Sequence, residues 1–288
     1  MKVAIIGGSG KMGQWFVRFL REEGKEVIIT GRNKTKLREA GKRLGVGTAT
    51  NIKAVKQADL VLLSVPIDNF EDVVRELGPY FQPNQSIIDL TSVKVMPMKV
   101  MHKYIKMGVV LGAHPVFGPG AKSVDNQNFV LTPTNDKERV LAQKAKQFLE
   151  TRGGRVSLMT PREHDELMAV VLGLAHFVGI IAADTLLNFS QLNEMESVSG
   201  STYKLLLMLA KSVITEDPEL YASIQMSLPG MPQIHRLFRQ TTKSWADIVK
   251  SKDRQGFVSR MNGIRDRLEK ADPHFRRAYN DMYKLLEK

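Results

Sequence analysis

Short apolar runs alternate with amphipathic stretches along the first half of the chain. The apolar run at residues 3–6 leads into several glycines, and the apolar residues that follow at helical spacing are Trp15, Phe16, Phe19 and Leu20. This order predicts a strand, then a tight turn, then a helix.

The same alternation continues to about residue 160. Further strands are predicted at residues 26–30, near residue 48, and at residues 59–65, 86–90, 109–112, 129–132 and 155–158. Helices are predicted at residues 33–44, 69–77 and 136–151. Because alternating strands and helices pair their strands in parallel and cover both faces with helices, we expect an α/β domain with a doubly wound parallel sheet over residues 1–160.

Strand patterns stop after residue 160, and an all-helical domain is expected over residues 161–288. Its helical periodicity is interrupted at Asp217-Pro218, at residues 229–232 and at Asp272-Pro273. The apolar run at residues 167–187 approaches the length of a membrane span, but His176 and Asp184 interrupt it. We therefore expect a helix that is buried on nearly all sides, at a domain or subunit interface, and no membrane segment.

Composition narrows the possible chemistry. The 288 residues include no cysteine, which excludes disulfides and thiolate chemistry and fits a cytoplasmic protein, as does the absence of a signal-peptide pattern. The formal net charge is +12, and residues 231–288 hold 14 lysines and arginines against 7 aspartates and glutamates. Such a basic segment suits either a binding surface for anions or a solvated helical face.

The glycines after the first strand have the spacing Gly8-x-Gly10-x-x-Gly13. In the Rossmann dinucleotide-binding turn the first glycine permits a tight turn, the second lets the backbone approach a pyrophosphate, and the third lets the helix pack close to the strand. The strand before and the helix after this turn favour a cofactor site over a structural turn. The residues assigned to it are Gly8, Ser9, Gly10, Lys11, Met12 and Gly13.

The end of the second strand discriminates between cofactors. NAD sites usually place an acidic residue there for the ribose 2′-hydroxyl, whereas this chain has Arg32, Asn33 and Lys34 after the strand. These residues suit a 2′-phosphate, so we expect NADP in preference to NAD.

Ligands of open parallel sheets bind outside the carboxyl ends of the strands, so residues just past each strand are candidates. Val65 and Pro66 follow one strand and are assigned to the cofactor site. His114 follows another and has the protonation range of a general base, so we expect it to remove a hydroxyl proton as hydride leaves the same carbon. Ser92 and Lys94 follow a third: Ser92 could bond the substrate or the imidazole and Lys94 an anionic group, or both could cap a helix.

Two other histidine-containing segments are weaker candidates. His176 lies in the apolar run, where a buried histidine with one hydrogen-bond partner is the commoner case. The acidic cluster His164-Asp165-Glu166 lacks the second histidine one turn away that a metal site of this kind needs, so no metal is expected.

Seven segments in order resemble the prephenate dehydrogenase family: GGSGKMGQWF, SVPI, DLTSVK, GAHPVFGPG, EHD at 163–165, AHF at 175–177 and DPELYASIQM at 217–226. The resemblance covers nearly the whole chain, and GAHPVFGPG after DLTSVK is its most specific part. It implies oxidative decarboxylation of prephenate to 4-hydroxyphenylpyruvate with hydride transfer to NAD(P), or the same reaction of arogenate.

The resemblance also implies residue roles. His114 matches the catalytic histidine, Ser92 a serine that hydrogen-bonds around it, and His176 a histidine that lines the substrate pocket. The helical half matches a dimerisation domain, which implies a homodimer. Where many relatives have an arginine for the ring carboxylate of the substrate, this chain has Lys204, which supplies charge without a bidentate fork. With a final helix near Lys288, no added regulatory domain is expected.

Two other functions remain as alternatives. One is another small-substrate dehydrogenase, such as a hydroxyacid or imine reductase, although those enzymes ordinarily place a lysine base in the helical domain. The other is a cofactor-sensing or nucleic-acid-binding protein that uses the basic C-terminal segment. That segment has no aromatic-and-glycine RNA signature, helix-turn-helix or zinc pattern, so no nucleic-acid partner is expected.

Overall fold

The computed structural model describes residues 1–286, and the chain forms two compact units, Met1–Met168 and the residues from Ala169 onward. The first unit extends past the expected boundary at residue 160 because helix α7 (Pro161–Met168) packs on the sheet and bonds to it through buried side chains. The end of the final helix that was predicted near Lys288 lies outside the described residues.

The first unit contains one eight-stranded sheet in the order β3-β2-β1-β4-β5-β6-β7-β8. The chain adds β2 and β3 on one side of β1 and then adds β4 to β8 on the other, which is the order of a doubly wound sheet. The strands are β1 (Lys2–Ile6), β2 (Glu26–Ile29), β3 (Gly47–Thr48), β4 (Leu60–Leu63), β5 (Ser86–Asp89), β6 (Val109–Pro115), β7 (Asn128–Thr132) and β8 (Arg155–Leu158).

The predicted doubly wound parallel sheet is confirmed, with one antiparallel strand pair at β7. The first six strands are mutually parallel, but β7 pairs antiparallel with β6, and β8 follows β7 in parallel. The reason is the connection between β6 and β7, which contains no helix to carry the chain back across the sheet. Strand β6 also runs three residues further than predicted, so that His114 lies within the strand, opposite Val130 of β7.

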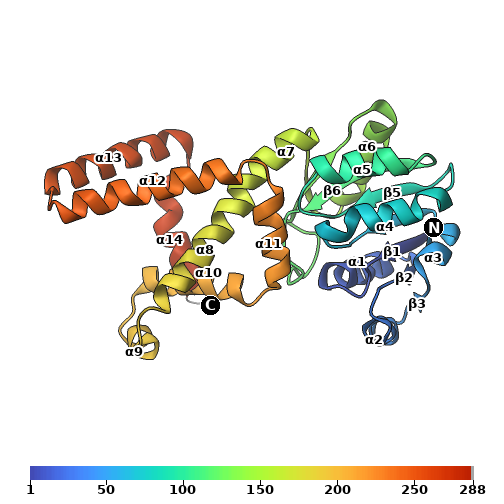
Figure 1. The fold of residues 1–288 in the computed structure, drawn as a ribbon, viewed down its shortest axis with the longest axis horizontal. Helices are drawn as coiled ribbons and strands as arrows, with labels where there is room; N and C mark the ends of the chain where they lie inside the picture. The colour runs from blue at the N-terminus through green and yellow to red at the C-terminus, as the bar shows by residue number, and fades with distance from the viewer. Residues whose placement is uncertain (287–288) are drawn as a thin grey trace. The chain divides into compact units, whose positions relative to one another are not determined.

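Helices cover both faces of the sheet (Figure 1). Val3 and Ile5 point to the face covered by α1, α2 and α6, whereas Ala4 and Ile6 point to the face covered by α3, α4 and α5. Both faces are apolar because alternate residues of a strand point in opposite directions and both sides of this sheet are buried. These helices are α1 (Lys11–Glu22), α2 (Lys34–Leu44), α3 (Asn51–Gln57), α4 (Phe70–Leu77), α5 (Val95–Tyr104) and α6 (Asp136–Glu150).

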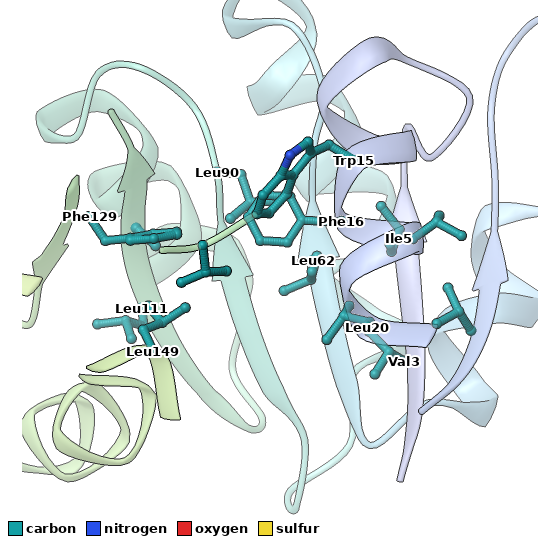
Figure 2. Packing of buried hydrophobic residues seen from close by; sticks show 14 of the residues in the cluster. Val3, Ile5, Trp15, Phe16, Leu20, Leu62, Leu90, Leu111, Phe129 and Leu149 are labelled. Carbon is teal, nitrogen blue, oxygen red and sulfur yellow. The ribbon is translucent and has the colours of Figure 1, made fainter. Parts of the chain in front are cut away.

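Aromatic residues of α1 fill much of the first face. Figure 2 shows Trp15 and Phe16 beside Leu62 and Leu90. The indole N–H of Trp15 donates to the carbonyl of Ala121 at 2.7 Å, which fixes the loop after β6 against α1. This packing holds the helix at the glycine turn in a defined position.

The second unit is all-helical, as expected. After a π-helical segment (Ala169–Leu174), α8 packs against α10, and α12 and α13 lie side by side (Figure 1). Its α-helices are α8 (Ala175–Leu186), α9 (Leu192–Ser197), α10 (Ser201–Ile214), α11 (Pro218–Ser227), α12 (Met231–Lys250), α13 (Arg254–Ala271) and α14 (Ala278–Leu286).

The helical stretch Pro161–Leu186 is long and apolar enough to cross a membrane, and 22% of its most apolar window is buried within the chain. Within the single chain this helix is not buried on nearly all sides, and its expected burial at a subunit interface stays a prediction. Large apolar side chains of this stretch are exposed, among them Val170, Val171 and Ile181.

Candidate active site

The turn after β1 has the geometry that close packing of strand and helix requires. A Cβ atom on Gly13 would lie 2.6 Å from the carbonyl oxygen of Gly7 and 2.8 Å from Cα of Gly8, so only glycine fits. The left-handed residue is Gly7, with φ +84°, rather than Gly8, at which a Cβ would meet Ile29 of β2 at 2.6 Å. Gly8 is thus required for packing against β2, and the tight turn depends on Gly7.

Helix α1 begins at this turn without a side-chain cap. Gly10 is its N-cap residue, and the first turn of the helix contains no acidic side chain. The N-terminus of a twelve-residue helix presents main-chain N–H groups and a partial positive charge, which suit a phosphate group. The residues present therefore fit a dinucleotide, and contact of its phosphates with Ser9, Gly10, Lys11 and Met12 stays a prediction.

The loop after β2 lies next to this turn. A Cβ on Gly31 would lie 2.5 Å from Oγ of Ser9, so the two loops are in contact. Arg32 and Lys34 are exposed there, but the side chain of Asn33 accepts the main-chain N–H of Lys36 at 2.9 Å as the cap of α2. Arg32 and Lys34 are free to meet a ligand, whereas Asn33 is engaged in the cap.

The turn also adjoins the residues after β4. The carbonyl of Ser64 lies so close to Gly7 that a side chain on Gly7 would overlap it. Val65 is partly exposed and Pro66 is exposed just beyond. Because strand order reverses between β1 and β4, these residues border the crevice where such sheets bind their ligands.

His114 lies near the carboxyl end of β6 with its imidazole 4% exposed. Its Nδ1 lies 2.8 Å from Nε2 of His164 on α7. No other hydrogen bond to the ring is formed within residues 1–286, and Nε2 of His114 is not one of the fully buried unpartnered atoms. One nitrogen is therefore held by the protein, while within residues 1–286 the other forms no hydrogen bond and is not completely buried.

Asp165 determines which nitrogen of each ring carries the proton. Its carboxylate accepts the main-chain N–H groups of Lys94 at 2.7 Å and Val95 at 2.9 Å, at the N-terminus of α5, and lies 2.7 Å from Nδ1 of His164. Since a carboxylate only accepts hydrogen bonds, Nδ1 of His164 donates and its Nε2 accepts. His114 then donates from Nδ1 and has its lone pair on Nε2, which is the form of a general base.

Both histidines are held in the uncharged state. Burial, followed by the nearby charges of His164 and Lys94, lowers the pKa of His114 well below its usual value. Burial also lowers the pKa of His164, and the hydrogen bond that its ring donates to Asp165 opposes this by raising the pKa. The site therefore contains a proton acceptor that is not already protonated at neutral pH.

Lys94 is not placed to bind a ligand. Its side chain is fully buried, and Nζ forms an ion pair with Asp89 and donates to the carbonyl of Ala113 at 2.8 Å. Removal from water lowers the pKa of Lys94 and raises that of Asp89, while their mutual contact opposes both changes. The prediction that Lys94 contacts the substrate is contradicted by this burial.

Ser92 is half-buried in the loop between β5 and α5 and forms no side-chain hydrogen bond with residues 1–286. It neither bonds the imidazole of His114, whose partner is His164, nor caps α5, whose N-cap residue is Lys94. A direct bond between Ser92 and a substrate remains a prediction.

His176 and Lys204 belong to the second unit. The ring of His176 packs edge-on against Tyr221 with centroids 4.5 Å apart, and its Nδ1 is buried without a hydrogen-bond partner. Burial lowers the pKa of His176. Lys204 is exposed on α10, and the predicted contact of both residues with substrate stays a prediction.

Sequence reasoning missed the chain of hydrogen bonds that Asp165 and His164, in the segment EHD at residues 163–165, form with His114. It considered His164 and Asp165 only as metal ligands, and within residues 1–286 no group of three or more such side chains could hold a metal ion. The signal was present, because EHD is one of the segments that carry the family resemblance. Asp89 was missed as well, since nothing in the strand pattern marks a carboxylate as the partner of a buried lysine.

Family models match both halves of the chain. The model described as "Prephenate dehydrogenase, nucleotide-binding domain" matches residues 16–158, and the model described as "Prephenate dehydrogenase, dimerization domain" matches residues 160–263. Together they cover residues 16 to 263 apart from residue 159, which is most of both units but not β1 or the glycine turn.

Individual proteins agree with the family models. The chain is 37% identical over 265 residues to a Methanocaldococcus jannaschii protein named "Probable arogenate/prephenate dehydrogenase", covering 91% of this chain and 59% of that one. It is 29% identical to the T-protein of Haemophilus influenzae, covering 92% and 66%. The chain thus spans about three fifths to two thirds of the length of these relatives.

Solved structures share the fold. The crystal structure of prephenate dehydrogenase from Aquifex aeolicus in complex with hydroxyphenyl propionate and NAD+ matches with a TM-score of 0.76 at 23% identity, over 94% of this chain and 98% of that one. The structure of Synechocystis arogenate dehydrogenase matches with a TM-score of 0.69 at 20% identity, over 93% and 99%.

Proposed function

The chain belongs to the prephenate dehydrogenase family, and from this premise we propose that it oxidatively decarboxylates prephenate to 4-hydroxyphenylpyruvate with NAD(P). His114 is the base that accepts the proton of the substrate hydroxyl. The observation that carries this assignment is the chain of hydrogen bonds from Asp165 through His164 to His114, which leaves the lone pair of His114 on Nε2.

The proposed reaction removes a proton, carbon dioxide and a hydride from the substrate. The hydroxyl proton passes to Nε2 of His114 as hydride leaves the same carbon. The ring carboxylate then leaves as carbon dioxide, its bonding electron pair completes the aromatic ring, and the phenolate oxygen regains a proton to give 4-hydroxyphenylpyruvate. A bound oxidised nicotinamide would supply the acceptor for this hydride. The imidazolium that forms on His114 donates from Nδ1 to His164, and the carboxylate of Asp165 stabilises the new charge.

We propose NADP as the preferred cofactor. The glycine turn and the uncapped N-terminus of α1 fit the pyrophosphate of either dinucleotide. The preference rests on Arg32 and Lys34, which are exposed beside Ser9 where a 2′-phosphate would lie, and on the absence of an acidic residue there. NAD is the alternative that the experiment below includes.

The negative groups of the substrate require cations from outside the His114 cluster, because Lys94 is buried and paired. We propose that Lys204 binds a substrate carboxylate and that His176 lines the pocket with its unpartnered Nδ1. A single lysine grips a carboxylate less specifically than an arginine. Arogenate, which differs from prephenate in its side chain, is therefore the second candidate substrate.

The exposed apolar residues of the stretch Pro161–Leu186 support a homodimer formed through the helical unit. In the same proposal the protein is cytoplasmic. Covering these side chains with a second copy would remove apolar surface from water, which is the main stabilising term in obligate dimers.

The test is a two-by-two assay of prephenate and arogenate against NAD and NADP, followed by the absorbance of the reduced nicotinamide. The proposal predicts the highest kcat/KM for prephenate with NADP, and 4-hydroxyphenylpyruvate as the product. Turnover of arogenate alone would move the assignment to arogenate dehydrogenase. No turnover of either substrate with either cofactor would refute the function.

A further inference from the structure

A fully buried lysine lies directly behind the proposed base. The ammonium group of Lys94 donates to the carbonyl of Ala113 at 2.8 Å, and Ala113 immediately precedes His114 in β6. The main-chain N–H of Lys94 donates at 2.7 Å to Asp165, which bonds to His164. Lys94 therefore contacts the peptide group that precedes His114. It is also linked to the imidazole of His114 through Asp165 and His164.

The residues around Lys94 leave room for its side chain. Gly112 lies beside it, and a Cβ at that position would be 3.1 Å from Cδ of Lys94 and 3.0 Å from Sδ of Met98. The carboxylate of Asp89 is also fully buried, and its second oxygen accepts the main-chain N–H of Thr91 at 2.8 Å. These polar contacts of the pair all lie inside the sheet domain.

Fold stability alone does not explain this arrangement. A buried ion pair has to offset the loss of hydration of both charges, and apolar residues of similar volume often stabilise a fold equally well or better. The pair Asp89–Lys94 joins the end of β5, the start of α5 and the backbone next to His114. This placement indicates a more specific use than fold stability.

We propose that Lys94 is a positioning residue for the reaction, which fixes His114 through the carbonyl of Ala113 and through Asp165 and His164. This inference rests on the proposed role of His114 as the base. The ammonium charge has a second consequence, because a positive charge near an imidazole opposes its protonation. The titratable groups around His114 are His164 and Asp165 from α7, Asp89 at the end of β5 and Lys94 at the N-cap position of α5.

The experiment compares Lys94→Met with the charge-free double variant Asp89→Asn, Lys94→Met. The single variant leaves the carboxylate of Asp89 buried without its partner and can fail to fold, whereas the double variant removes both charges together. The matched control is Lys99→Met, the same substitution at an exposed position of α5. Thermal melting identifies the folded variants.

Two readouts separate positioning from stability. In the ligand-free protein, the titration of His114 followed by NMR moves to higher pH in the folded Lys94 variants and is unchanged in Lys99→Met. In turnover by the Lys94 variants, kcat falls about 10²-fold. The acidic limb of their kcat/KM profile moves to higher pH, and the dissociation constant of the cofactor is unchanged.

A folded double variant with the same His114 titration and the same kcat as the parent protein overturns the proposal. A double variant that does not fold also overturns it, because the pair is then a structural element. The NMR titration needs no substrate, so it decides this inference even if neither prephenate nor arogenate is turned over, which would refute only the proposed function.

Discussion

Nε2 of His164 lies 2.8 Å from Nδ1 of His114, although fifty positions separate the two residues in the chain. The contact joins helix α7 to strand β6 and gives His114 a fixed tautomer, because His164 is itself held by Asp165. The predictions below follow from this contact, from the buried lysine behind it and from the glycine turn at the same edge of the sheet.

Asp165→Asn is expected to lower kcat by about 10²-fold or more. The amide can donate to Nδ1 of His164, which reverses the tautomer of His164 and moves the proton of His114 to Nε2, where the lone pair is needed. The matched control is Glu166→Gln on the same helix, whose carboxylate is exposed and pairs with Arg162 at the surface. Steady-state kinetics with saturating cofactor measure both variants, and equal kcat values for the two would contradict the tautomer argument.

The acidic limb of kcat/KM is expected below pH 6.5, the ordinary value for histidine. Burial and nearby positive charge lower the pKa of His114, so the uncharged base persists as the pH falls through 6.5 and is lost only at lower pH. Since kcat/KM reports the free enzyme, its pH profile measures this group directly. An activity that already declines at a pH above 6.5 would show that His114 is not the group that titrates.

Arg32→Ala is expected to reduce kcat/KM for NADP by at least tenfold, about 1.4 kcal/mol of lost transition-state stabilisation, and to leave kcat/KM for NAD nearly unchanged. The reason is that only NADP carries the 2′-phosphate that an exposed guanidinium beside Ser9 would contact. Lys36→Ala, at an exposed position in the first turn of α2, is the control. An equal loss with both cofactors would place Arg32 outside the 2′-phosphate site.

Gly13→Ala is expected to abolish measurable cofactor binding. The new Cβ would lie 2.6 Å from the carbonyl oxygen of Gly7, and neither backbone segment can move without separating α1 from β1. Gly263→Ala is the control, because its Cβ enters open space on α13 and alanine favours a helix by roughly 0.5–1 kcal/mol over glycine. Calorimetric titration with NADP compares them, and unchanged affinity in Gly13→Ala would argue against a dinucleotide at this turn.

Much of the sheet domain can be predicted from apolar periodicity. Strands such as β1 and β4 are short apolar runs between turn residues, and their buried faces leave one arrangement for them. The direction of β7 could not be predicted in this way, because it depends on the absence of a helix between residues 116 and 127 rather than on the strand itself. The same antiparallel pairing extends β6 over His114 and Pro115.

The site is predictable in its local parts and not in its non-local ones. The glycine turn is a local motif, and His114 stands out by its place after a strand. Its bond to His164 and the burial of Lys94 are tertiary contacts, and a lysine after a strand is ordinarily exposed to water. Only packing of α7 and α5 against the carboxyl end of the sheet reveals that Lys94 supports the site from within.

The most direct test of the account is the kcat of His114→Asn with prephenate and NADP, measured together with the affinity for NADP. Asparagine retains a donor for His164 but has no basic nitrogen at the position of Nε2. The account predicts that kcat falls by about 10²–10⁴-fold while cofactor affinity is unchanged. A variant that turns over at the parent rate would contradict the assignment of His114 as the base.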